Sequence, residues 1–458
     1  MRVHSFSLKQ IHHFKTLTLD FESGTQDTAI TVLLGEQNTG KSLILKNLFH
    51  TLSWFAARLK DLRSAGIVIA DQDMRPDASQ AALTVTIQYP DILGITTDDK
   101  YTADTAHSCT WTIRKIKTQT SNMGISRADT AELDLLIPHY QKQLQQDPHF
   151  GLPCIAYYPA QRFVYEVNLH AKNSSMLHTQ HAYDLTANQL TTFNKFFEWL
   201  REVYDLENAQ AAALLRQYLQ PNTRFHTQAQ LDELFSSLEQ GYRHSSQRCM
   251  TSLRRAIKSM FPDVHDIWID LQTQPTLMIK QGEKNLAYMS LSPTYRAWIA
   301  LIGDIVRRAC LLHPKSLFPE QEVEGVILID EIDAHLDTTH RQHILANLQH
   351  TFPRLQFIVS SLHDDIIDEP SSIECYQITA LHANKYQLEE YQQQLNAIYQ
   401  HLSSTHLDSH SELENSHEDQ PNATTCSVTQ LLALSQQLDP IQQQELLLQL
   451  QALIQTQD

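Results

Sequence analysis

Residues 35–42 combine the side chains and the spacing that are needed to hold nucleotide phosphates. They read Gly-Glu-Gln-Asn-Thr-Gly-Lys-Ser, which matches Gly-x-x-x-x-Gly-Lys-Ser/Thr, between a short apolar run and a segment with helical periodicity. Backbone N–H groups of such a loop surround the phosphates, while Lys41 reaches the β- and γ-phosphates and Ser42 binds Mg²⁺. We therefore expect this loop to bind nucleotide through Gly35, Glu36, Gln37, Asn38, Thr39, Gly40, Lys41 and Ser42.

A second motif supplies carboxylates that suit metal-dependent hydrolysis. Residues 326–331 read Val-Ile-Leu-Ile-Asp-Glu, an apolar strand that ends in two acidic residues. If this strand lies beside the strand before the P-loop, Asp330 reaches the Mg²⁺ and Glu331 can act as the general base that polarises the attacking water. An apolar strand followed by Asp-Glu is common on its own, and it gains weight here because a P-loop precedes it.

The two motifs lie far apart in the chain. About 290 positions separate Lys41 from Asp330, more than twice what a compact nucleotide-binding core needs. A large insertion must therefore divide the two halves of the site.

The first part of the insertion, residues 61–150, contains two segments in which apolar residues alternate with other residues. These are Leu83, Val85, Ile87 and Tyr89, then Cys109, Trp111 and Ile113. We interpret it as an inserted β lobe that binds a ligand or partner. An equally good alternative is a plain extension of the sheet in the nucleotide-binding part of the chain, here called the head.

The second part of the insertion, residues 166–265, is predicted to be helical. An apolar stripe at helical spacing favours a core face over a base-stacking platform, and it consists of Phe193, Phe196, Phe197, Leu200 and Tyr204. No heptad persists for three repeats, so we expect a compact lobe rather than a coiled-coil arm. The basic group of Arg254, Arg255 and Lys258 is interpreted as a solvated helix face, with DNA contact as the alternative.

The end of the sequence has a different composition. Residues 403–426 are polar and acidic, which is typical of a flexible linker. Residues 427–458 carry two leucine faces at helical spacing, which predict two short amphipathic helices. These faces must be buried, either on the chain's own head or on a partner or neighbouring subunit.

Composition excludes several classes of protein. The 458 residues carry 35 basic and 52 acidic side chains, and the net charge of −17 argues against a protein that coats nucleic acid electrostatically. No apolar stretch approaches the ~20 residues of a membrane helix, and no signal segment opens the chain. The six cysteines form no CxxC pair, and His335, His340 and His343 lack a further ligand at metal-site spacing. We expect a cytoplasmic protein that does not associate with membranes.

Several segments resemble the RecF/SMC-like group of ABC-type ATPases. Residues 1–15 resemble the first strands of that group, and residues 327–336, Ile-Leu-Ile-Asp-Glu-Ile-Asp-Ala-His-Leu, resemble its Walker B motif and D-loop. Residues 157–162, Tyr-Tyr-Pro-Ala-Gln-Arg, resemble the Q-loop region of OLD-like bacterial ATPases. Residues 291–296 stand at the position of the ABC signature and are followed by a helix that is expected from Ala297 to Leu312. The chain also resembles the ATPase subunit of bacterial anti-phage systems, such as Septu (PtuA-like) and the retron-linked ATPases.

This resemblance implies a fold, ligands and partners. The fold class would be α/β, an ABC-type P-loop NTPase head split by a β-rich and a helical insertion, with short C-terminal helices. The ligands would be ATP and Mg²⁺, with Gln161 as a further metal contact, Ser292 as a nucleotide contact from the signature, and Glu331 as the catalytic glutamate. The heads of this group associate with each other, and a separate effector protein such as a nuclease is expected.

Departures from the family's pattern bear on turnover. The signature glycine is replaced by Thr294, whose β-branched side chain would obstruct the approach of one subunit to the γ-phosphate held by the other. The switch-histidine position holds Leu362, and His363, one residue later, would point to the opposite face. Gln37 and Asn38 stand where the family has Asn and Gly, although Asn38 suits a left-handed backbone. We therefore expect secure ATP binding and slow hydrolysis.

The function that these features favour is an oligomeric, nucleotide-sensing regulator or scaffold that controls a separate effector in bacterial anti-phage defence. The alternative is a RecF/SMC-like DNA-repair ATPase that acts directly on DNA, and the net charge counts against it. The predicted division of the chain is head halves at 1–60 and 266–402, a β lobe at 61–150, a Q-loop-like segment at 151–165, a helical lobe at 166–265, a linker at 403–426 and helices at 427–458.

Overall fold

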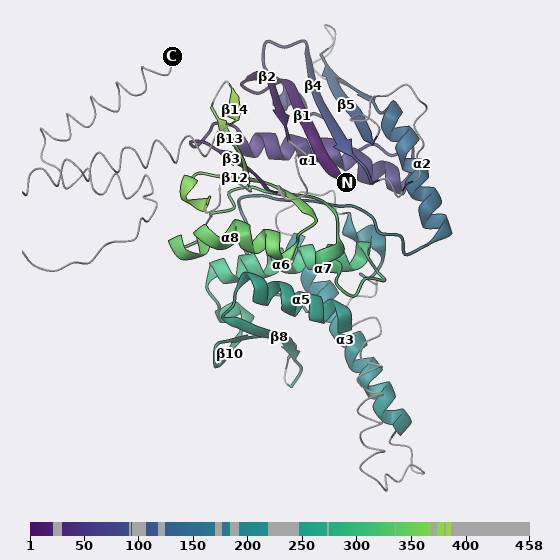
Figure 1. Cartoon of the computed structure of the whole chain (residues 1–458), viewed down its shortest axis with the longest axis vertical. Coiled ribbons are helices and arrows are strands. Elements are labelled where there is room, and N and C mark those ends of the chain that lie inside the picture. Colours follow the sequence, from purple (N-terminus) through teal and green to yellow (C-terminus); the bar gives the residue numbers. More distant parts are fainter. Residues whose placement is uncertain are drawn as a thin grey trace, which may run out of the picture.

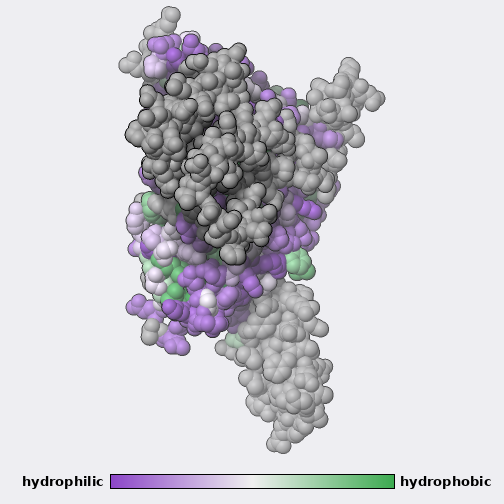
Figure 2. All heavy atoms as spheres, turned by 60° about the vertical axis from the view of Figure 1, so that its left-hand side comes forward, coloured by the Kyte–Doolittle hydropathy of each residue, from purple (hydrophilic) through white to green (hydrophobic). Residues whose placement is uncertain are grey.

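A computed structural model gives the arrangement of the chain (Figure 1). It describes residues 1–21, 30–90, 93, 107–117, 124–169, 176–183, 192–218, 247–272, 274–334, 336–367, 373–379 and 382–385. The predicted linker, the predicted C-terminal helices and His335 lie outside the described residues. Among the helices that are described, none is long and apolar enough to cross a membrane. The coloured surface in Figure 2 is mostly hydrophilic, with the apolar side chains gathered in the core.

A six-stranded sheet carries the two chemical motifs at one edge. Its order is β14-β13-β3-β12-β11-β7, and its strands are β3 (Ile30–Leu34), β7 (Cys154–Tyr158), β11 (Gly325–Ile329), β12 (Leu355–Ser361), β13 (Ile373–Ile378) and β14 (Ala383–Lys385). Every neighbouring pair is parallel except β13 with β14. The strands β3, β11 and β12 are buried along their whole length, which explains why they read as unbroken apolar runs.

The two motif strands are not direct neighbours in the sheet. The strand β12 lies between β3 and β11 and pairs in parallel with both. The P-loop and Asp330 still come together, because parallel strands end at the same edge of a sheet. Three apolar strands of similar composition contain no signal for their order, so the sequence could not distinguish a direct neighbour from a strand one place removed.

A five-stranded antiparallel sheet covers the P-loop helix. Its order is β2-β1-β4-β5-β6, and its strands are β1 (Arg2–Ile11), β2 (Phe14–Asp20), β4 (Gln80–Gln88), β5 (Ser108–Ile116) and β6 (Ile125–Asp129). The strand β4 pairs with β1 from Arg2 opposite Gln88 to Lys9 opposite Ala82. The strands within residues 61–150 therefore extend the sheet that β1 and β2 begin. This pairing agrees with an extension of a sheet of the head, and the binding of a ligand or partner by this segment stays a prediction.

The helix α1 (Lys41–Lys60) lies between the two sheets. It contacts β4 on one side and β7 and β12 on the other, and Trp111 of β5 donates a 3.0 Å hydrogen bond to the Thr51 carbonyl of α1. The helix α2 (Ala131–Gln146) packs beside it against β5. The apolar residues of α1 are buried almost all round, because sheets cover opposite faces of the helix.

A helical layer covers the opposite face of the central sheet (Figure 1). It comprises α3 (Thr192–Tyr218), α5 (Gln247–Met260), α6 (Pro293–Leu312), α7 (Pro319–Glu322) and α8 (Thr338–Thr351). A small sheet of β8 (Val264–Asp270), β9 (Thr276–Gln281) and β10 (Lys284–Ala287) is attached to it. The 3₁₀ turns are η1 (Asp71–Asp73), η4 (Thr179–Ala182), η5 (Tyr288–Ser290) and η6 (Asp364–Ile366).

Two predictions about this helical layer can be compared with the structure. Phe196, Phe197 and Leu200 are fully buried, so the aromatic stripe of α3 belongs to the core as predicted. The helix expected to begin at Ala297 begins instead at Pro293. Ser292 caps it, since its hydroxyl oxygen accepts a 3.3 Å hydrogen bond from the backbone N–H of Tyr295 in the first turn. Proline suits the first helical position.

A buried charged cluster fastens α6 to the central sheet. The Asp304 carboxylate accepts hydrogen bonds from Arg307 Nε at 2.8 Å, Arg308 Nε at 2.8 Å and the Tyr158 hydroxyl of β7 at 2.9 Å. Burial alone would raise the pKa of Asp304, but the two arginines outweigh it and lower the pKa to about 2. The same arginines donate to backbone carbonyls of η4, so the cluster joins α6, β7 and η4.

We expect Asp304→Asn to lower the free energy of unfolding by about 3–5 kcal/mol, because two buried guanidinium groups lose their counter-charge. The matched control is Asp266→Asn, which removes the partly exposed partner of Arg254 and should cost less than about 1 kcal/mol. Denaturant unfolding at neutral pH compares the two variants.

The same cluster predicts a pH dependence. Because the pKa of Asp304 is lowered on folding, its contribution is present above about pH 4 and is lost as the pH falls toward 2. Equal destabilisation by Asp304→Asn and Asp266→Asn would contradict this role for the cluster.

Candidate functional site

The loop between β3 and α1 turns through two residues with left-handed backbone. Gly40 has φ 98° and Asn38 has φ 65°. A Cβ atom on Gly40 would lie 2.6 Å from Cε2 of Phe14 and 2.8 Å from the imidazole of His13, so this position admits only glycine without rearrangement. Asparagine adopts the left-handed conformation more readily than other side chains do, and the backbone of Asn38 is as predicted.

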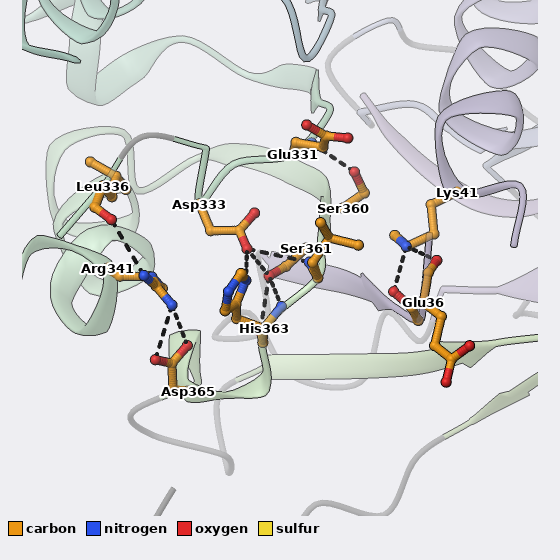
Figure 3. A network of polar contacts seen from close by, with 12 residues as sticks. Glu36, Lys41, Glu331, Asp333, Leu336, Arg341, Ser360, Ser361, His363 and Asp365 are labelled. Carbon is orange, nitrogen blue, oxygen red and sulfur yellow. Dashed lines mark hydrogen bonds and ion pairs between the residues drawn. The ribbon is translucent and has the colours of Figure 1, made fainter. Parts of the chain in front are cut away.

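The Lys41 ammonium lies inside this loop. Its Nζ donates hydrogen bonds to the carbonyls of Gly35 at 2.5 Å and Glu36 at 2.7 Å (Figure 3). Burial lowers the pKa of Lys41, while the carboxylates of Asp330 and Glu331 oppose that shift. The ammonium is thus held by the loop that the sequence assigns to phosphate binding.

Ser42 and Asp330 meet at the edge of the central sheet. The Ser42 hydroxyl donates a 3.0 Å hydrogen bond to Oδ1 of Asp330, across 288 positions of sequence. The Ser360 hydroxyl at the end of β12 donates to the same oxygen at 2.6 Å. The structure therefore brings together two of the three residues predicted to bind Mg²⁺, one from each half of the head. Ser360 was missed by sequence reasoning, because one serine at the end of an apolar strand has no motif around it.

Glu331 lies two residues after the end of β11 and faces the P-loop across a cavity. The cavity has a volume of ≈ 520 Å³ and is lined by His12, His13, Gln37, Asn38, Thr39, Gly40, Lys41, Ser42, Leu43, Glu331 and Leu362. It gathers most of the predicted nucleotide contacts and the predicted general base around one space. His12 and His13, from the turn between β1 and β2, are additions that the sequence patterns did not indicate.

Two predicted site residues lie elsewhere. Within the described ranges, neither Gln161 nor Ser292 lines this cavity. Gln161 is exposed in the segment that follows β7, and Ser292 is exposed at the N-terminus of α6. A single chain therefore does not bring these two residues to the P-loop, and their roles stay predictions.

The residues after β12 are arranged as their spacing predicts. Leu362 lines the cavity, whereas His363 turns toward Asp333, with 2.8 Å between its Nδ1 and Asp333 Oδ2 (Figure 3). The Ser361 hydroxyl also donates to Asp333 Oδ2, at 2.8 Å. An apolar side chain therefore occupies the place at the cavity where the family pattern has an imidazole.

The basic group on α5 is largely neutralised by neighbours. Arg254 pairs with Asp266 at 2.7 Å, and Arg255 pairs with the buried carboxylate of Glu320. These pairs agree with a solvated helix face and do not favour DNA contact. In the part of the chain that the structure describes, no group of three or more His, Cys, Asp or Glu side chains could hold a metal ion.

Comparison with known proteins gives a family and several relatives. The family described as RecF/RecN/SMC N terminal domain matches residues 7–387. The Retron Vc95 probable ATPase of Vibrio cholerae serotype O1 biovar El Tor is 26% identical over 388 residues, which cover 79% of this chain and 70% of the relative. The Retron Ec83 probable ATPase of Escherichia coli is 24% identical over 398 residues, covering 79% and 68%.

A third relative and one solved structure complete the comparison. The Septu protein PtuA of Bacillus mycoides is 32% identical over 111 residues, which cover 24% of this chain and 15% of that protein. The crystal structure of the SmcHead bound to the C-winged helix domain of ScpA has a TM-score of 0.47 and 13% identity, covering 85% of this chain and 100% of that one. The matches confirm the predicted resemblance to ABC-type ATPases of the retron and Septu kind.

The packing around the loop predicts that Gly40→Ala destabilises the protein more than Gly282→Ala does. Both glycines have left-handed backbone, but a methyl group on Gly282 would meet nothing within 4 Å. Its cost should be the backbone strain alone, about 1–2 kcal/mol. At Gly40 the overlap with the Phe14 ring adds to that strain. Denaturant unfolding measures both losses, and an equal loss would show that the neighbours do not constrain the P-loop.

Proposed function

The chain belongs to the RecF/RecN/SMC N-terminal domain family, and on that premise we propose that it binds ATP with Mg²⁺ in the cavity between the P-loop and Glu331. The single observation that carries this proposal is the meeting of Ser42 with Asp330 beside Lys41. Hydroxyl and carboxylate oxygens are the donors that Mg²⁺ prefers, and such sites are completed by phosphate oxygens and water. Their chemistry fits the ion.

Each side chain of the cavity has a proposed role. Lys41 would exchange its two carbonyl partners for phosphate oxygens, since an ammonium forms stronger bonds with charged acceptors. Glu331 would accept the proton of the attacking water. Bound Mg²⁺ would neutralise charge on the β- and γ-phosphates, held by Ser42 and Asp330. Gln161 and Ser292 would join the site only when the heads move or associate.

We propose that hydrolysis is slow. Leu362 lines the cavity and cannot donate a hydrogen bond to phosphate, whereas the imidazole of His363 faces Asp333. Thr294, in the first turn of α6, places a branched side chain where the family has glycine. Both features weaken the response to the γ-phosphate more than they weaken binding.

The biological role that we propose is nucleotide sensing in anti-phage defence. Two relatives are named as probable ATPases of retrons and a third as a Septu protein, which supports this setting. We propose that the cytoplasmic protein self-associates through its heads and controls a separate effector such as a nuclease. The nucleotide-binding halves would be residues 1–60 and 266–402.

Replacing Lys41 with alanine should weaken ATP binding by roughly 100-fold, the equivalent of about 3 kcal/mol, because the phosphates lose a charge-assisted partner. Lys46→Ala is the matched control, since Lys46 lies one turn further along α1 and outside the cavity lining. Isothermal titration with ATP and Mg²⁺ measures both affinities. Unchanged affinity for Lys41→Ala would overturn the assignment of the P-loop.

Glu331→Gln should retain ATP binding and lose turnover by at least ~100-fold, because an amide cannot accept a proton from water. Phosphate release at saturating ATP measures turnover, and titration of the same preparation measures binding. Equal phosphate release from this variant and from wild type would show that Glu331 is not the general base.

A further inference from the structure

Arg162 extends from the segment after β7 to the end of β11. Its side chain is buried, although it belongs to an irregular segment next to exposed residues. Nη2 donates a 2.8 Å hydrogen bond to the Glu331 carbonyl, and Nη1 donates to the carbonyls of Asp330 and, at 3.1 Å, Pro159. One guanidinium group therefore binds two consecutive carbonyls of the acidic motif and a carbonyl of its own segment.

The backbone that Arg162 contacts has an unusual conformation. Glu331 has φ 44°, in the left-handed region that costs a side-chain-bearing residue about 1–2 kcal/mol. Its N–H donates a 2.8 Å hydrogen bond to Ser360 Oγ (Figure 3). The strands β12 and β7 lie on opposite sides of β11. Ser360 holds the turn from the end of β12, and Arg162 holds it from the segment that follows β7.

An arginine suits this position better than a lysine would. The planar guanidinium offers several N–H donors in a fixed arrangement, so it can bind adjacent carbonyls at once, whereas an ammonium is a point charge. Burial lowers the pKa of Arg162 to about 10, against the opposing effect of Asp330 and Glu331, so the group remains charged at neutral pH. The central carbon of the Arg162 guanidinium lies over the Trp298 ring of α6, 6.0 Å from the ring centroid.

We propose that Arg162 is a positioning residue that holds the backbone of Glu331 in the left-handed turn and so directs its carboxylate toward the nucleotide cavity. Arg162 does not line that cavity, and it acts only through the carbonyls of Asp330 and Glu331. The proposal rests on the proposed function for the catalytic role of Glu331. It assigns no contact between Arg162 and the nucleotide.

The kinetic test compares Arg162→Ala with a matched arginine. Arg248, at the start of α5, also donates to three backbone carbonyls, but these lie at the C-terminal end of α6 and just beyond it, at Cys310, His313 and Ser316. Arg162→Ala should lower kcat by roughly 100-fold, because small misplacements of a reacting group have effects of that size. The KM and the Kd for ATP should stay unchanged, and Arg248→Ala should keep the wild-type kcat.

Two further variants separate positioning from a general loss of structure. Free guanidinium at low millimolar concentration should restore part of the kcat of Arg162→Ala and none of that of Glu331→Gln. Arg162→Lys retains charge and stem and should still lose most of the turnover, because it cannot bind both carbonyls. A wild-type kcat in either Arg162 variant, or a loss matched by Arg248→Ala, would overturn the proposal.

A crystal structure of Arg162→Lys provides a test that does not depend on turnover. We expect the Glu331 backbone to leave the left-handed region and its carboxylate to turn from the cavity. A turn that keeps its conformation, with Ser360 still bound to the Glu331 N–H, would contradict the proposal even if activity were lost. If wild-type protein binds no ATP, the proposed function fails, and this structure alone decides whether Arg162 shapes the turn.

Discussion

The hydrogen bond from Ser42 to Asp330 is the contact on which the rest of the site depends. It joins the first turn of α1 to the end of β11, across 288 positions of sequence. In the proposed site neither half supplies all the groups for a nucleotide and its metal, because one contributes the phosphate loop and the other the carboxylates. The parallel sheet satisfies this constraint by ending β3, β12 and β11 at one edge.

The second requirement is that the side chains of Asp330 and Glu331 are both held in fixed positions at this edge of the sheet. Asp330 is fixed by two serine hydroxyls, and Glu331 follows it in a left-handed turn. Such a turn persists only where neighbours over-determine it. Ser360 supplies one constraint from the end of β12, and Arg162 supplies the other from the segment after β7. The buried cluster around Asp304 fastens α6 to the same sheet, and the N-terminus of α6 carries the signature-like residues 291–296.

Sequence reasoning predicted the parts of the structure that have local signals. The P-loop, the buried strands and the core face of α3 follow from residue spacing and hydrophobic periodicity. The position of β12 between the motif strands, and the pairing of β4 with β1, depend on contacts between distant segments of similar composition. The start of α6 was predictable, since Ser292-Pro293 is a capping signal. Arg162 and Ser360 were not, because their partners are backbone groups far away in the sequence.

The central claim is that ATP and Mg²⁺ occupy the cavity where these two halves meet. The most direct measurement is a crystal structure of the protein with Mg²⁺ and a non-hydrolysable ATP analogue. We expect Lys41 Nζ to leave the carbonyls of Gly35 and Glu36 for the phosphates, and the metal to bind Ser42 and Asp330. A bound analogue that leaves Lys41 on those two carbonyls, or that lies away from this cavity, would contradict this claim.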